Sequence, residues 1–99
     1  MTREEILDAA RKCVCGDCDK KHGRPEDSFR KIAKFWGVYK GTSFSREDVA
    51  IMMALLKVAR ISTGTEPADS YIDLAGYAAC AGELAAASET YEEWESAYA

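Results

Sequence analysis

The sequence predicts an all-α domain, and three observations lead to this prediction. Apolar residues recur at helical spacing in four successive segments, and no segment alternates apolar and polar residues over five positions. Proline, glycine and capping-box pairs fall between those segments, where helices begin and end. The 99 residues suit one domain. We therefore expect a single domain over residues 1–99, built as a compact bundle of four main helices plus a short C-terminal helix.

The first helix is expected to begin after Thr2 and to end at Gly16. Thr2 and Glu5 have the spacing of a capping box, in which the hydroxyl accepts from a free backbone N–H and the glutamate reaches back. The polar residues 16–24 show no periodicity and predict a loop. The apolar stripe of this helix is expected to consist of Ile6, Leu7, Ala10, Cys13 and Val14.

The second helix is expected to begin at Pro25, because proline lacks the N–H that would be unsatisfied at a first helical position. Glu26 and Asp27 follow at the positive end of the helix dipole. Gly41 ends the helix. Its buried face is expected to consist of Phe29, Ile32, Ala33, Trp36 and Tyr39.

The third helix follows a second capping-box pair, Ser45 and Asp48, and should run to about Ile61, before Gly64. Residues 49–56 are apolar on every side. Such a helix is buried all round, either at the centre of the domain or between subunits. Three short neighbours do not obviously cover it, so we expect a homo-oligomer, most simply a two-fold dimer.

The fourth helix is expected from about Ala68 to Ala87, after Pro67. Gly76 and Gly82 each cost roughly 1 kcal/mol in a helix relative to alanine, so we expect another helix to cross there. The packed face should carry Ile72, Ala75, Gly76, Ala79 and Leu84.

A short last helix is predicted by the Thr90–Glu93 capping pair. Its spacing places Tyr91, Trp94 and Tyr98 on one face.

Charge is distributed unevenly along the chain. The net charge is −4, which argues against broad electrostatic binding to nucleic acid or an anionic membrane. Residues 11–40 carry a balance of +5, whereas residues 41–99 carry −7. The basic segment is interpreted first as solvated helix faces, second as a phosphate-facing patch, and third as a contact with the acidic half of the chain or of another subunit. Its aromatic residues have the spacing of a core stripe.

The cysteines near the end of the first helix do not have the spacing of a structural zinc site. Cys13, Cys15 and Cys18 are followed by His22, whereas structural zinc usually uses paired Cys-x-x-Cys or Cys and His units. We therefore expect no structural zinc there. Thiols are the favoured state, because intracellular chains stay reduced.

Acidic and basic side chains on the third and fourth helices form the candidate site. Asp69 and Asp73 are four residues apart, and Lys57 and Arg60 are three apart. Carboxylates can hold a magnesium ion while Lys57 and Arg60 bind phosphate, which would make a nucleotide site. The structural alternative, which we favour, is that Asp73 pairs with Lys57 or Arg60 between the two helices.

Three blocks resemble a family of small phage and prophage proteins known only as a domain of unknown function. They are GRPEDSF (Gly23–Phe29), DVAIMMALLKVAR (Asp48–Arg60) and DSYIDLAGYAAC (Asp69–Cys80), and the opening EEILDAARKCVCGD is similar too. The resemblance covers roughly residues 3–84. It implies a phage origin and a cytoplasmic location in an infected or lysogenic bacterium, and it implies no reaction.

A second, weaker likeness is to the all-helical MazG-type nucleoside triphosphate pyrophosphohydrolases, which are oligomeric bundles that hold magnesium on acidic pairs of two successive helices. Asp69, Asp73 and Tyr77 resemble the second of these helices. The third helix of this chain departs from the pattern, because apolar residues stand where the first acidic pair would be. Glu26 is the acid that would fill the gap, and the likeness implies a metal site of Glu26, Asp69 and Asp73.

Two functions follow from these observations. The first is binding, and hydrolysis as an extension, of a nucleotide between the helices with magnesium. The second is a non-enzymatic interaction or accessory protein that acts on a host or phage partner. No apolar run reaches the 18 residues of a membrane-spanning helix, and no secretion signal opens the chain.

Overall fold

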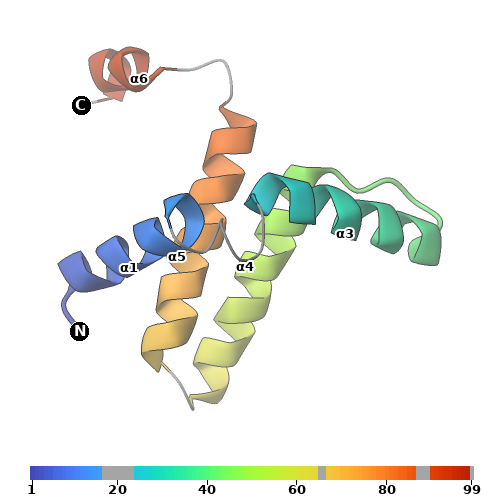
Figure 1. Ribbon diagram of the computed structural model, residues 1–99, viewed down its shortest axis with the longest axis horizontal. Coiled ribbons are helices and arrows are strands. Elements are labelled where there is room, and N and C mark those ends of the chain that lie inside the picture. The colour runs from blue at the N-terminus through green and yellow to red at the C-terminus, as the bar shows by residue number, and fades with distance from the viewer. Residues whose placement is uncertain (17–23, 65–66, 87–89, 99) are drawn as a thin grey trace.

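The computed structural model describes residues 1–16, 24–64, 67–86 and 90–98, and these contain helices and no strand. The helices are α1 (Arg3–Cys15), α3 (Pro25–Lys40), α4 (Arg46–Thr63), α5 (Pro67–Ala85) and α6 (Tyr91–Tyr98) (Figure 1). The predicted all-helical class is confirmed, and so are four longer helices followed by a short one.

The predicted capping boxes are all present. Thr2 Oγ1 accepts from the N–H of Glu5 at 3.1 Å, and Ser45 Oγ accepts from the N–H of Asp48 at 3.0 Å. In the reverse direction, Asp48 Oδ2 accepts from the N–H of Ser45 at 2.9 Å. The Thr90–Glu93 pair caps α6 in the same way, with the N–H of Glu93 donating to Thr90 Oγ1 at 3.1 Å. These starts follow from contacts within four residues, which is why the sequence predicts them.

The α3 and α4 helices both end at the predicted glycines. Gly41 and Gly64 have φ values of 69° and 79°, in the left-handed region that favours glycine. In each case the glycine N–H donates to a carbonyl four residues back, that of Gly37 or Arg60.

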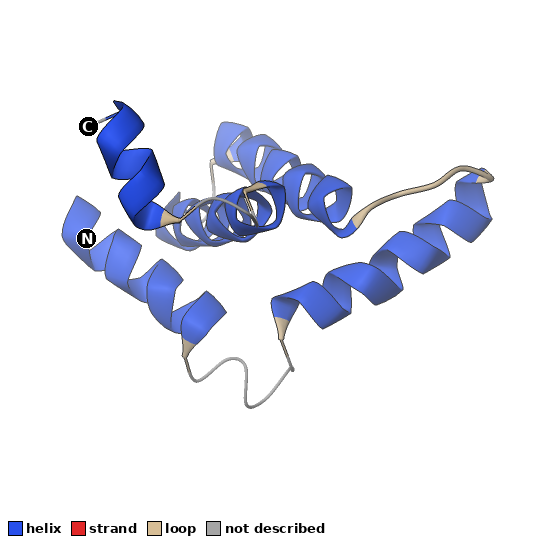
Figure 2. Cartoon of the chain, turned by 90° about the horizontal axis from the view of Figure 1, so that it is seen from above, coloured by secondary structure: helices blue, strands red, loops and turns tan. Residues whose placement is uncertain are grey.

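The helices α4 and α5 form an antiparallel pair at the centre of the molecule (Figure 1). α1 crosses α5, and α3 packs against α4. Viewed from above, α1 and α3 diverge from each other, and the 42–45 segment returns along α3 to the start of α4 (Figure 2). The close helix pairs are α4–α5, α1–α5 and α3–α4, and α6 belongs to none of them.

The core lies where α3, α4 and α5 meet. Val49 of α4 is completely buried, and Trp36 packs edge-on against Phe44 with ring centroids 6.0 Å apart. The other buried members of the core are Phe29, Ala33, Ala50, Cys80 and Ala81.

The predicted stripe of α1 and face of α3 are each correct in part. Ala10 is buried, but Leu7 is 63% exposed and Cys13 is also exposed. On α3, Phe29 and Ala33 are buried, whereas Tyr39 is 85% exposed. The C-terminal half of α3 runs away from α4 and α5, so Tyr39 lies beyond the helices that would cover it (Figure 1).

Of the two places expected for the apolar α4, the centre of the domain is wrong for one side of the helix, and burial between subunits stays a prediction. Val49 and Ala50 are buried, but the opposite side of the helix is open. We call that side the outer face of α4. It consists of Ile51, Leu55 and Val58, which are 46–61% exposed, and it is flanked by Met52 and Leu56, which are 40% and 43% exposed.

One of the two predicted glycine crossings is present. A Cβ on Gly76 would lie 3.1 Å from Val14 Cγ1, so Gly76 marks the place where α1 crosses α5. At Gly82 an added Cβ would meet nothing within 4 Å, and Gly82 and Ala79 are both exposed. The prediction for Gly82 and Ala79 is therefore wrong, because they lie on the side of α5 that α1 and α4 leave uncovered.

The arrangement is more open than the expected compact bundle. The chain exposes 7493 Å² of surface, whereas a compact monomer of this mass exposes about 5600 Å². The radius of gyration is 14.7 Å, compared with about 13 Å for a compact chain of this length.

Candidate functional site

The antiparallel packing of α4 and α5 brings Lys57 and Asp73 together. Lys57 Nζ lies 2.9 Å from Asp73 Oδ2, and the two side chains are 16% and 34% exposed. The prediction that Asp73 pairs with a cation of the preceding helix is confirmed, with Lys57 as the partner. Lys57 is mostly buried, so the carboxylate balances a charge that is largely removed from water.

Tyr77 lies one turn after Asp73 on α5 and joins this pair to the core. Its ring is 6.1 Å from the ring of Phe29 between centroids. Burial raises the pKa of Tyr77, the nearby Lys57 ammonium lowers it, and the Asp73 carboxylate raises it. Lys57, Asp73 and Tyr77 therefore form a small polar cluster at the edge of the core. Asp73 is its carboxylate and is 34% exposed.

Arg60 and Asp69 lie nearer the connection between α4 and α5, and both are exposed. Glu26 lies at the start of α3 and is 2.7 Å from Arg24 between Oε2 and Nη2. No three His, Cys, Asp or Glu side chains in the described parts of the chain form a group that could hold a metal ion. The structure therefore brings Lys57 and Asp73 together but does not gather Glu26 with Asp69 and Asp73.

Two members of the cysteine cluster fall within the described residues. Cys13 and Cys15 are exposed at the end of α1, and Cys80 is buried in the core of α5. Cys18 and His22 lie outside the described residues, so the expectation about zinc stays a prediction.

A groove of about 770 Å³ lies between α3 and the segment that leads into α4. Its apolar lining includes Ala33, Val38 and Phe44. Its cationic lining consists of Arg30, Lys34 and Arg46. We call it the basic groove. The sequence indicated a basic second helix but not this groove; the available signal was the four-residue spacing of Arg30, Lys34 and Val38 on one helix face.

The fold and these sites define a small all-helical protein with a polar pair inside a helical hairpin and an open basic groove. The chain belongs to the family of domain of unknown function DUF6378, whose model matches residues 5–85. The predicted resemblance to a family of unknown function is thereby confirmed. No solved structure matches the chain.

Two curated relatives are phage proteins. The chain is 38% identical to the Gene 55 protein of Mycobacterium phage D29 over 77 residues, which cover 78% of this chain and 51% of that protein. It is 40% identical to the Gene 55 protein of Mycobacterium phage L5 over 74 residues, which cover 74% and 47%. The chain thus spans about half the length of these relatives. The MazG-type likeness stays a prediction.

The described helices include none that is long and apolar enough to cross a membrane.

Proposed function

We propose that this protein is a non-enzymatic interaction protein of the bacterial cytoplasm that works as a two-fold dimer, with the outer face of α4 as the contact between copies. The observation that carries the proposal is the apolar surface of α4. A second copy is the occupant we assign to it, because the excess of exposed surface is of the size that an obligate homodimer buries.

The excess exposed surface supports this assignment. The chain exposes 7493 Å², about 1900 Å² more than a compact monomer of its mass. A stable interface of standard size removes about 800 Å² from each partner, and obligate homodimers remove more. A standard interface would remove less than half of this excess, whereas an obligate homodimer interface, which buries roughly 1000–2500 Å² per partner, is large enough to remove most of it.

The composition of the outer face also fits a subunit contact. Ile51, Leu55 and Val58 recur at spacings of four and three, so they form one continuous stripe. Met52 and Leu56 widen it, and all five side chains are about half exposed. Burying the exposed half of each would contribute about 1 kcal/mol. A helix packed on its own copy about a two-fold axis would bury both stripes at once.

The oligomeric state of Leu55→Glu tests the proposal. Sedimentation velocity at micromolar concentration should give twice the 10.9 kDa of one chain for the wild type and a single-chain mass for Leu55→Glu. Leu7→Glu is the matched control, because Leu7 is 63% exposed on α1 and Leu55 is 61% exposed on α4. That control should remain dimeric. A monomeric wild type at these concentrations would contradict the proposal.

Nucleotide binding with magnesium is the second candidate function, and the Lys57–Asp73 pair is the observation that favours it. The pair joins α4 and α5 as expected of a site between helices, and Asp73 is 34% exposed. In this candidate, Lys57 and Arg60 bind phosphate, and Asp69 and Asp73 approach the metal. Arg60 and Asp69 are exposed and available to a ligand.

A thermal-shift series with nucleoside di- and triphosphates, with and without magnesium, tests this candidate. Binding to the native state raises the melting temperature by mass action. A shift that requires magnesium and disappears in Asp69→Asn would support a nucleotide site. The absence of any shift at millimolar nucleotide would exclude tight binding and leave the interaction function as the better account.

A further inference from the structure

We propose that the basic groove is a docking site for the α6 helix of a second copy of this chain. The proposal goes beyond the dimer contact at α4, because it uses other surfaces and does not require the outer face. It rests on the groove, on the composition and position of α6, and on the match between their charges.

The groove combines an apolar floor with cations on both walls. Its apolar lining includes the side chains of Ala33, Val38 and Phe44. Arg30 and Lys34 lie on the α3 wall, and Arg46 lies on the opposite wall at the start of α4. The volume of about 770 Å³ falls within the range of sites that hold a ligand of several side chains.

The cations of the groove form few ion pairs with carboxylates of the described residues. Lys34 and Arg46 have no carboxylate of the described residues within ion-pair distance. Arg30 has only a long contact of 3.8 Å with Asp27. Three cations around one apolar floor select an acidic, partly apolar partner.

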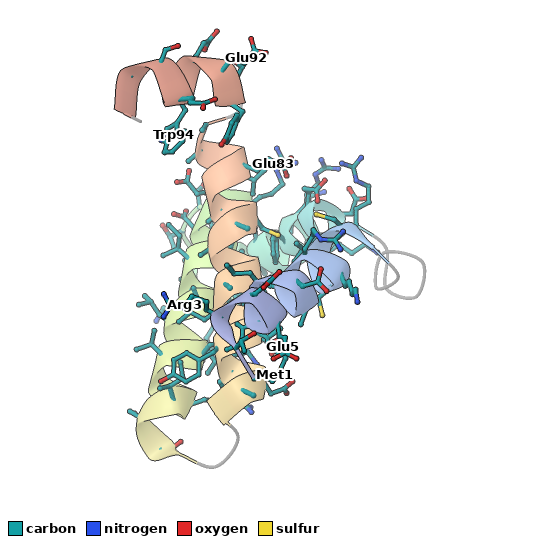
Figure 3. The ribbon with its side chains drawn as sticks, turned by 90° about the vertical axis from the view of Figure 1, so that its left-hand side faces the viewer. Met1, Arg3, Glu5, Glu83, Glu92 and Trp94 are labelled. Carbon is teal, nitrogen blue, oxygen red and sulfur yellow. The ribbon has the colours of Figure 1, made fainter. Side chains whose placement is uncertain are left out.

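The α6 helix has the complementary composition. Its sequence is YEEWESAY, with Glu92, Glu93 and Glu95 and no basic residue. Tyr91 is 72% exposed and its ring lies 5.7 Å from that of Trp94 between centroids. Glu92 and Trp94 lie on opposite sides of the helix (Figure 3). The exposed Tyr91 ring would contact the groove floor while the acids meet the cations on the walls.

The position of α6 makes it available to another copy. The helix stands beyond the end of α5 and away from α3 and the 42–46 segment, which line the basic groove of its own chain (Figure 1). An isolated helix of eight residues is marginal in water. A partner surface would therefore stabilise α6, and the groove of a second copy offers the matching charge.

Photo-crosslinking in the full chain tests the proposal. One chain carries the photo-crosslinking residue p-benzoylphenylalanine in place of Tyr91 and has natural isotopes. It is mixed with ¹⁵N-labelled wild-type chains, and after irradiation the crosslinked products are identified by mass spectrometry. The expected products join position 91 of a natural-isotope chain to residues 30–46 of a ¹⁵N-labelled chain. The experiment is run in the Leu55→Glu background as well, at a protein concentration well above that of the sedimentation experiment, where the weaker α6 contact is expected to give the same products from chains that sediment singly at micromolar concentration. If the mixed-isotope products disappear in Leu55→Glu, the α6 contact depends on the α4 dimer. That result would overturn the proposal that the two contacts are independent.

Charge reversal identifies the cause of the contact. Lys34→Glu with Arg46→Glu should lower the yield of mixed-isotope products by more than about tenfold, because attraction is replaced by repulsion. Adding Glu92→Lys, Glu93→Lys and Glu95→Lys in the same chain should restore it. Lys31→Glu with Lys40→Glu is the matched control, since it changes the net charge equally on exposed parts of α3 outside the groove, and it should leave the yield unchanged.

Four results would overturn the proposal. Products confined to one isotope would place α6 on its own chain. Crosslinks to other surfaces would show that α6 does not bind in the groove. A yield that is unchanged by charge reversal at Lys34 and Arg46 would show the same. A single-stranded oligonucleotide that binds the wild type and not the charge-reversed groove, without products from position 91, would assign the groove to nucleic acid.

Discussion

The two sides of α4 have nearly the same side-chain chemistry and very different surroundings. On the inner side, Val49 and Ala50 are buried and Lys57 is held by Asp73 of α5. On the outer side, Ile51, Leu55 and Val58 are about half exposed. Hydrophobic periodicity cannot distinguish the two sides of such a helix, because each is apolar. The difference teaches that the inner side stabilises the single chain, whereas the outer side is available for assembly.

The largest expected effect lies where α1 crosses α5 on the inner side of the structure. Gly76→Leu should lower the stability by about 3 kcal/mol, because its Cβ would already be 3.1 Å from Val14 Cγ1. For a domain of this size that loss corresponds to a decrease in melting temperature of roughly 10–20 °C. Differential scanning calorimetry of the variant and the wild type measures it.

Gly82→Leu is the matched control for Gly76→Leu. An added Cβ at Gly82 meets nothing within 4 Å, and leucine is the better helix former by up to about 1 kcal/mol. The control should therefore melt at or above the wild-type temperature. Equal destabilisation of both variants would mean that neither glycine marks the crossing.

The second prediction compares the same side chain on the two sides of α4. Val49 is 0% exposed and Val58 is 48% exposed. Val49→Ala should cost about 2 kcal/mol, because it leaves a cavity in the core. At dilutions where the chain is monomeric, Val58→Ala should cost less than about 0.5 kcal/mol.

Urea unfolding at two protein concentrations measures both substitutions. A cost for Val58→Ala that increases with protein concentration would support the dimer at the outer face, since assembly adds to the stability of the native state. If both substitutions lower the free energy of unfolding equally at high dilution, the inner and outer sides of α4 do not differ in burial as described.

The third prediction concerns the ion pair on the inner side. Asp73→Asn leaves the mostly buried Lys57 ammonium without its carboxylate, and the cost should be about 1–2 kcal/mol. The cost falls below that of a fully buried pair because Asp73 is 34% exposed. Melting temperatures with and without magnesium and nucleotide measure it.

Asp8→Asn is the control for the ion pair, because it breaks an exposed contact of 2.8 Å with Arg11 and should change the melting temperature far less. An Asp73→Asn variant that is more stable than the wild type and has lost a ligand-induced shift would favour the nucleotide function over the structural role.

The smallest expected effect is a pH dependence at Tyr77. Because burial raises its pKa from the ordinary value of 10.0, the folded chain keeps the phenol neutral to a higher pH than the unfolded chain does. The stability from this group is therefore complete below pH 10 and is lost as the pH increases through the folded pKa. Urea unfolding between pH 9 and 11 should show a steeper loss in the wild type than in Tyr77→Phe. Identical profiles for the wild type and Tyr77→Phe would contradict the assignment.

The sequence by itself determined the features that are made within a few residues of the chain. The caps at Thr2, Ser45 and Thr90 and the ends at Gly41 and Gly64 depend on local hydrogen bonds and backbone conformation. The pairing of Asp73 with a cation of the preceding helix was also predicted, because a short connection makes two helices antiparallel, whereas the choice of Lys57 over Arg60 came from the structure. Family membership likewise followed from sequence blocks.

Only the tertiary structure decided which apolar surfaces are covered. Tyr39 lies on the same periodic face as Phe29, but one is 85% exposed and the other 4%, because α3 extends past its neighbours. Gly76 and Gly82 are equally small, but α1 crosses only the first. The basic groove needs the returning 42–46 segment to close its second wall. Burial depends on where neighbouring helices start, cross and end, and these long-range positions are not encoded in the spacing of residues along one helix.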